Sequence, residues 1–240
     1  MSRTFKPCMA VLSPAQQRLW PALSKAADLG FVLYGGTAVA LQLGHRPSVD
    51  FDFFSENPLD REAIEAAFPF IVQSTPIQDE KNAWSLLVPC GDSDRRHVKV
   101  CFFGAIGFGR VGEPGFTDDG VLQVACLDDL MATKVKVVLQ RAEAKDYRDV
   151  AAMVDAGISL PHGLAAAKAI FGPNFQPSES LKALVYFDDG DLKTLTTAEK
   201  NTLVQAVKAV RDIPEVKVIS KMLTGTDRNE LDNTNTKEAR

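Results

Sequence analysis

The hydrophobic pattern of this chain changes near residue 126, from short apolar runs to longer helical periods. Before that point, short apolar runs bounded by turn-forming residues predict strands at residues 31–34, 49–54, 70–72, 83–88, 98–103 and 121–125. A helix is expected from Ser13 to near Gly30, and another from residue 57 until Pro69 stops it. Residues 104–120 are glycine-rich and predict an irregular loop that lines a site.

Helical periodicity dominates the second part of the chain. Helices are expected at residues 127–140, 145–156, 161–170, 178–187 and 197–210. Strands mixed with helices, then helices alone, indicate an α/β (α+β) domain over residues 1–125, with a mixed sheet flanked by helices, and an all-helical domain over residues 126–222. Residues 223–240 are polar and lack a hydrophobic pattern, which predicts a tail that is disordered or ordered only by a partner.

The strand at residues 31–34 runs directly into two glycines. Gly35 and Gly36 permit positive φ angles and let a ligand approach the backbone closely. Thr37 follows as the expected N-cap of a short helix over residues 38–43. A strand that ends in a glycine turn and a helix start can offer backbone N–H groups to phosphates.

The next strand carries two carboxylates. Successive side chains of a strand point to opposite faces, so Asp50 and Asp52 share one face while Phe51 and Phe53 take the other. Neighbouring carboxylates repel each other unless a cation lies between them. Mg²⁺ suits this arrangement, because it accepts one or two carboxylates and completes its shell with water and substrate phosphates. The alternative to a metal site is that both carboxylates are solvated on the exposed face of an edge strand and bind nothing.

Composition limits the function classes. The 240 residues are 45% hydrophobic and 24% charged with a net charge of −4, so no overall basic field attracts nucleic acid. The four cysteines form no CxxC pair, which argues against a zinc site or a disulfide scaffold. No apolar run reaches membrane-spanning length, so we expect a cytoplasmic protein with no membrane partner.

These motifs resemble a known family. Gly35-Gly36 followed by Asp50-x-Asp52 resembles the first motif of polymerase-β-like nucleotidyltransferases. The fuller pattern resembles the AbiEii/AbiGii toxin family of bacterial toxin–antitoxin and abortive-infection systems, in Gly-Gly-Thr-Ala and Arg46-x-Ser48-x-Asp50-x-Asp52-Phe53. A later block is similar to that family's second motif and comprises Lys134, Arg141 and Lys145-Asp146-Tyr147-Arg148-Asp149.

The resemblance implies a nucleotidyltransferase that moves a nucleoside monophosphate from an NTP to RNA, with tRNA as one candidate, or to a protein. It also implies a toxin with a separately encoded antitoxin. Mg²⁺ or Mn²⁺ would bind Asp50 and Asp52, and Lys134 would contact the triphosphate. The remaining triphosphate-binding candidates are Gly35, Gly36, Thr37, Arg46 and Ser48. Asp149 matches the last acidic position of the family, with its role open between orienting Lys134 and contacting nucleotide or metal.

One departure from the pattern concerns a third carboxylate. Such enzymes commonly carry one on a later strand, whereas one face of the strand at residues 98–103 presents Lys99 and Cys101 and the other presents Val100 and Phe102. A general base would then come from elsewhere, the candidates being Asp92, Asp94, Asp146 and Asp149. Otherwise the metal acts without a base, or the chain is a nucleotide-binding or protein-interaction module with weak or no catalysis. An antibiotic-modifying nucleotidyltransferase is a further alternative.

Overall fold

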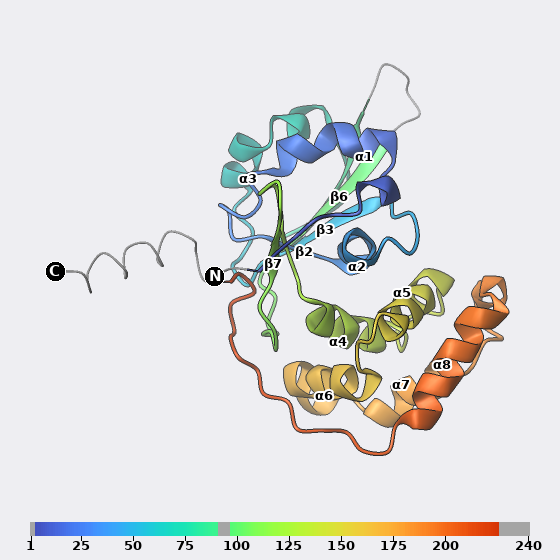
Figure 1. The fold of residues 1–240 in the computed structure, drawn as a ribbon. Coiled ribbons are helices and arrows are strands. Elements are labelled where there is room, and N and C mark those ends of the chain that lie inside the picture. Colours follow the sequence, from blue (N-terminus) through green and yellow to red (C-terminus); the bar gives the residue numbers. More distant parts are fainter. Residues whose placement is uncertain (1–2, 91–96, 226–240) are drawn as a thin grey trace.

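An eight-stranded mixed sheet forms the centre of the molecule (Figure 1), in a computed structural model that describes residues 3–90 and 97–225. The strand order is β1-β7-β8-β2-β3-β6-β5-β4. At its centre, β3 (Asp50–Phe54) runs antiparallel to β2 (Val32–Tyr34) and parallel to β6 (His97–Phe103). The Asp-x-Asp strand is therefore paired on both sides and is not an edge strand.

Alternation along β3 separates core from site. Phe51 and Phe53 are fully buried and pack against Phe102 of β6 and Trp20, with ring centroids 5.6 Å apart for Phe53–Phe102 and 6.2 Å apart for Trp20–Phe51. Burying each phenylalanine contributes about 1.5–3 kcal/mol to stability. A slip of one residue would put Asp52 in that core, so the phenylalanines fix the register that places the carboxylates on the opposite face.

The outer strands differ from the predictions in two places. Residues 70–72 are not a strand but part of a 3₁₀ helix, η3 (Pro69–Gln73), in which Ile71 is buried while Val72 is 84% exposed. The sheet edge is instead β4 (Thr75–Glu80), whose polar sequence contains no apolar run that would predict a strand. The predicted loop at 104–120 contains a short strand, β7 (Gly115–Thr117). The remaining strands are β1 (Thr4–Phe5), β5 (Ala83–Pro89) and β8 (Gln123–Val124).

Strands β5 and β6, predicted at residues 83–88 and 98–103, pair antiparallel. Residues 91–96, which connect them and include Asp92 and Asp94, lie outside the described residues. The chain after residue 225, where most of the predicted polar tail falls, also lies outside them.

Helices α1 (Pro14–Leu19) and α3 (Arg61–Ala67) cover one face of the sheet (Figure 1). Ser13, where this helix is expected to begin, is the N-cap of α1 and forms a capping box with Gln16. The single helix predicted from Ser13 to Gly30 is wrong beyond Leu19, where the chain tightens into the 3₁₀ helix η2 (Trp20–Leu23), which has a proline in its first turn. Helix α2 (Gly35–Leu43) lies on the other face and contacts β3, α4 (Leu127–Val137) and α5 (Ala144–Asp155).

From residue 127 to residue 209 the described elements are helices. They comprise α4 (Leu127–Val137), α5 (Ala144–Asp155), α6 (Leu160–Phe171), η4 (Gly172–Asn174), α7 (Pro177–Ala183), η5 (Leu192–Thr194) and α8 (Thr197–Ala209). After α8 the chain returns to the sheet half, where Ser220 pairs with Arg110 and the Leu223 side chain is buried. The division at residue 125 therefore stays a prediction. Among the described residues, none of the helices combines the length and apolar character needed to span a membrane.

Candidate active site

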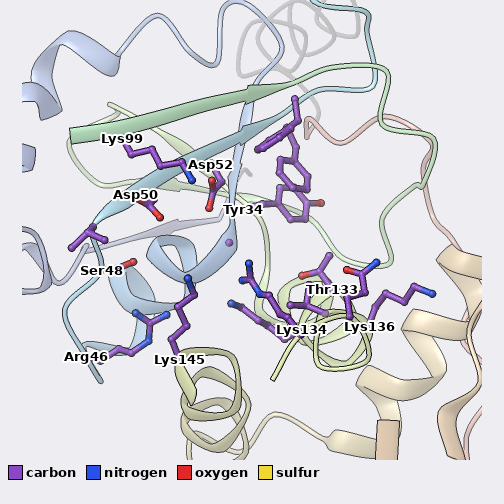
Figure 2. Close-up of a pocket in the computed structure, with 18 of the residues that line it drawn as sticks. Tyr34, Arg46, Ser48, Asp50, Asp52, Lys99, Thr133, Lys134, Lys136 and Lys145 are labelled. Atoms are coloured by element: carbon purple, nitrogen blue, oxygen red, sulfur yellow. The ribbon is translucent and has the colours of Figure 1, made fainter. Parts of the chain in front are cut away.

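A pocket of about 580 Å³ separates the Asp-x-Asp face of the sheet from helices α4 and α5. Asp50, Asp52 and Lys99 line its sheet side, and Lys134 and Lys136 line its helix side (Figure 2). The two carboxylates therefore share one face, as the alternation predicts. They face a cationic wall from the second half of the chain.

Gly35 lies directly beside Asp52. Its φ is +73°, a conformation that favours glycine, and a Cβ built there would collide with the Asp52 carboxylate. A Cβ on Gly36 would collide with the Arg46 guanidinium. The two glycines thus let a helix start approach one carboxylate and one guanidinium more closely than any side chain would permit.

The carboxylate pair has the electrostatics of a cation site. Burial raises the pKa of Asp52 most, and the charge of Asp50 raises it further. Lys99 and Lys134 lower this pKa by a smaller amount. A divalent cation would relieve this repulsion, and carboxylate oxygens are the ligands that Mg²⁺ prefers. In the described part of the chain, no three His, Cys, Asp or Glu side chains cluster closely enough to hold a metal alone. A metal at this pair fits only with water or substrate phosphate completing its shell.

Thr37 and Ser48 tie α2 to the beginning of β3. The N-cap of α2 is Tyr34, so the prediction of Thr37 as N-cap is wrong, because the helix already begins at Gly35. The buried Thr37 hydroxyl instead donates to the Asp50 carbonyl and lies 2.7 Å from the Ser48 hydroxyl. These bonds fix the backbone of Asp50. Ser48 also lines the pocket.

A buried ion-pair network lies behind the helix side of the pocket. The Lys134 ammonium is 2.6 Å from both Asp146 and Asp149. Arg46 makes a two-pronged contact with Asp149, from Nε at 2.7 Å and Nη2 at 2.9 Å, and His45 Nε2 lies 2.8 Å from the same carboxylate. Arg141 forms a similar fork on Asp146, from Nε at 2.8 Å and Nη2 at 3.3 Å.

Both acids of this network are held ionised. Burial alone would raise the pKa of Asp149, but Lys134 and hydrogen bonds from His45 and Arg46 hold it well below its usual range. Burial is likewise outweighed at Asp146, where Lys134 and Arg141 lower the pKa. Neither carboxylate lines the pocket, whereas Arg46, Lys134 and Arg141 do. The two acids therefore lie on the side of the cations away from the pocket, where they hold the cationic side chains in place.

The strand register settles which face of β6 adjoins the carboxylates. Asp50 pairs with Lys99 and Asp52 pairs with Cys101. Burial raises the pKa of the Cys101 thiol to about 11, so this group is neutral near pH 7. Lys99 extends into the pocket (Figure 2), a contribution that the sequence patterns did not single out.

The fold is similar to that of nucleotidyltransferase toxins. The solved structure of MenT4, a nucleotidyltransferase toxin from Mycobacterium tuberculosis H37Rv, is similar with a TM-score of 0.54 at 14% identity. The match covers 91% of this chain and 90% of that one.

The family model for the nucleotidyl transferase AbiEii toxin of type IV toxin–antitoxin systems matches residues 21–213. The chain belongs to the AbiEii nucleotidyltransferase toxin family, which confirms the resemblance seen in its motifs. An uncharacterized protein of Aquifex aeolicus (strain VF5) is 29% identical over 175 residues, covering 70% of this chain and 81% of the relative.

Proposed function

We propose that the chain is a metal-dependent nucleotidyltransferase and the toxin of a toxin–antitoxin pair. It would transfer a nucleoside monophosphate from an NTP to RNA. The observation that carries this proposal is the opposition of two charged walls across one pocket. Asp50 and Asp52 form the acidic wall, and Arg46, Lys134 and Arg141 form the basic one.

The triphosphate fits between these walls. Lys134 and Arg46 would pair with phosphate oxygens, with Arg46 suited to them by its planar donor fork. The α2 N-terminus at Gly35 and Gly36 would offer backbone N–H groups. Asp146 and Asp149 would act as positioning residues, because they hold the cations from behind.

Asp50 and Asp52 would hold Mg²⁺ or Mn²⁺. When bound, such an ion would neutralise charge on the α-phosphate and on the leaving pyrophosphate. An acceptor hydroxyl oxygen would bond to the α-phosphorus as the bond to the β-phosphate oxygen breaks. Pyrophosphate would leave, and the hydroxyl proton would pass to solvent. Ser48 and Thr37 would keep Asp50 in place through the contacts between α2 and β3.

RNA is the acceptor that the charge at the pocket favours over protein. Arg141 and Lys145 line the pocket and are exposed, within a chain of net charge −4, so positive charge lies where an acceptor would enter. Lysine and arginine that neutralise nucleic-acid phosphates account for most sequence-independent binding. A tRNA end is one form this acceptor could take.

A second candidate is a nucleotide-binding module on the same fold with little catalysis. The observation that favours it is Cys101, which pairs with Asp52 where a third carboxylate would stand. A transfer assay separates the two functions. The chain is incubated with each labelled NTP, Mg²⁺ and total cellular RNA, alongside the Asp50→Ala/Asp52→Ala variant.

Label on RNA that requires both aspartates supports the enzyme. Nucleotide binding without transfer to RNA, to added protein or to an aminoglycoside supports the module. Label that the double variant transfers equally well would contradict a role for the carboxylates.

A further inference from the structure

The pocket has an aromatic end that the transfer chemistry does not use. Its rings come from both halves of the chain and comprise Tyr34, Phe54, Phe103, Phe108 and Phe171. Tyr34 pairs with Asp52 in the β2–β3 register, and Phe54 lies two residues further along the carboxylate face. The aromatic end therefore adjoins the carboxylate pair at Asp52, beside which Figure 2 shows Tyr34.

Four of these rings, all except that of Tyr34, differ from those of the core. Phe51, Phe53 and Phe102 are fully buried on the opposite face of the sheet. Phe54 and Phe103 are only half-buried, although they belong to the same two strands, and so are Phe108 and Phe171. They keep ring surface open to the pocket, where a planar ligand could cover it.

Phe108 links the rings into one cluster. Its ring centroid lies 6.2 Å from that of Tyr34, 6.2 Å from Phe54 and 5.3 Å from Phe171. Phe54 and Phe103 meet edge to face at 5.3 Å. Offset and edge-to-face rings at these separations stabilise one another, so the cluster forms a preorganised surface.

The loop that carries Phe108 is anchored on both sides. Ala105 N–H donates to the Asn57 carbonyl at 2.7 Å, and Ile106 N–H donates to the Ser55 carbonyl at 3.1 Å. Beyond Phe108, Arg110 N–H donates to the Ser220 carbonyl at 2.9 Å. Ala105 adopts a φ of +53°, an unusual conformation for a non-glycine residue, which these bonds hold. The ring is thus positioned before any ligand arrives.

We infer that the aromatic end binds the nucleobase of the NTP, with Phe108 and Phe171 as stacking residues. This rests on the proposed function, since it places the triphosphate beside Asp52 and so directs the base toward Tyr34 and Phe54. Stacking on aromatic side chains tolerates any base. Lys136, whose Nζ lies 6.0 Å from the Phe171 ring centroid, is a polar group available at this end to distinguish one base from another.

Binding measurements without acceptor test this inference apart from catalysis. Dissociation constants for Mg²⁺–NTP and for Mg²⁺–tripolyphosphate are measured by calorimetry on the full chain and on Phe108→Leu and Phe171→Leu, since leucine keeps most of the packing. Phe70→Leu is the matched control, because Phe70 is also half-buried but packs against Phe68, away from the pocket. Thermal unfolding confirms that each variant is folded.

Each pocket variant should weaken NTP binding about 5- to 150-fold, the range found when one stacked ring is removed. Tripolyphosphate binding should not change, and Phe70→Leu should resemble the parent chain. Unchanged NTP binding in both folded pocket variants would overturn the inference, even if the transfer assay is positive. An increase only in the KM for the RNA acceptor would also overturn it, because the rings would then hold an acceptor base. If the parent chain transferred no label but the pocket variants still bound NTP more weakly than it does, only the proposed function would be refuted.

Discussion

The buried carboxylate of Asp149 is the point at which the two halves of the site are joined. It is fully buried and contacts Lys134 of α4 together with His45 and Arg46 of the turn before β3. Asp149→Asn keeps the shape of the side chain and removes its charge. Lys134 and Arg141 would then share the charge of Asp146, and Arg46 would lose the carboxylate that it contacts at 2.7 Å.

The expected cost follows from the contacts that survive. Removing one partner of a buried ion pair destabilises a protein by about 3–5 kcal/mol. Lys134 keeps Asp146 at 2.6 Å, and Arg46 is 15% exposed and can regain water, so we expect the lower end of that range. About 3 kcal/mol corresponds to a fall in Tm of about 6–12 °C for a chain of this size. Urea unfolding followed by circular dichroism measures the free energy directly.

The pH dependence gives a second observable. The folded-state pKa of Asp149 lies below the ordinary aspartate value of about 3.9. The stability that the charged Asp149 contributes to the fold is therefore fully present above about pH 3.9. The contribution is lost as pH falls below about 3.9 toward the folded-state pKa. The stability difference between the parent chain and Asp149→Asn should therefore be constant from about pH 6 to 8 and shrink below about pH 4.

Asp28→Asn is the matched control, because Asp28 pairs with Lys25 in an ion pair whose side chains are both 63% exposed. That variant should change stability by less than about 1 kcal/mol. If Asp149→Asn cost no more than the control, or if its cost persisted unchanged in acid, the carboxylate would not be the anchor inferred from these contacts.

Three further predictions concern the pocket. Gly35→Ala should abolish Mg²⁺-dependent NTP binding, because its Cβ would displace the Asp52 carboxylate. The control is Gly120→Ala, at a similar φ of +72° with open space around it, which should show only the backbone strain of about 1–3 kcal/mol. Equal NTP binding in both variants would refute the collision with Asp52. Thr37→Val should lower the free energy of unfolding by about 1–3 kcal/mol, because it leaves buried polar groups of Ser48 and Asp50 without their partner, whereas no change would show that these bonds carry no stability. Lys134→Met should weaken tripolyphosphate binding at least about tenfold in calorimetry, since a charge-assisted contact is worth about 1.5–3 kcal/mol. Undiminished binding would show that Lys134 does not contact the triphosphate.

Local patterns were sufficient to predict the centre of the molecule. The alternation of Asp50, Phe51, Asp52 and Phe53 specified both the strand and its two faces, because a polar and an apolar set at period two can be accommodated in only one way. The start of helix α1 at Ser13 is equally local. Strand β4 was missed because an edge strand is largely solvated, so its sequence need not be apolar, and residues 70–72 were mistaken for it.

The site depended on contacts that no local pattern contains. Sequence spacing could not reveal that Asp149 lies behind Arg46, which is 103 positions away in the chain. Only the family resemblance associated the two segments. The aromatic end is a similar case, because Phe54, Phe108 and Phe171 come from separate parts of the chain. The register of β3 against β6 was needed to place Lys99 and Cys101 beside the carboxylates.

A crystal grown with Mn²⁺ and a non-hydrolysable NTP analogue would test the central claim most directly, through the anomalous signal of the metal. The account predicts a peak within ligand distance of both Asp50 and Asp52 and of a phosphate oxygen, on the pocket side of Gly35. A fully bound analogue whose metal lies elsewhere, with the two carboxylates turned from its phosphates, would contradict it.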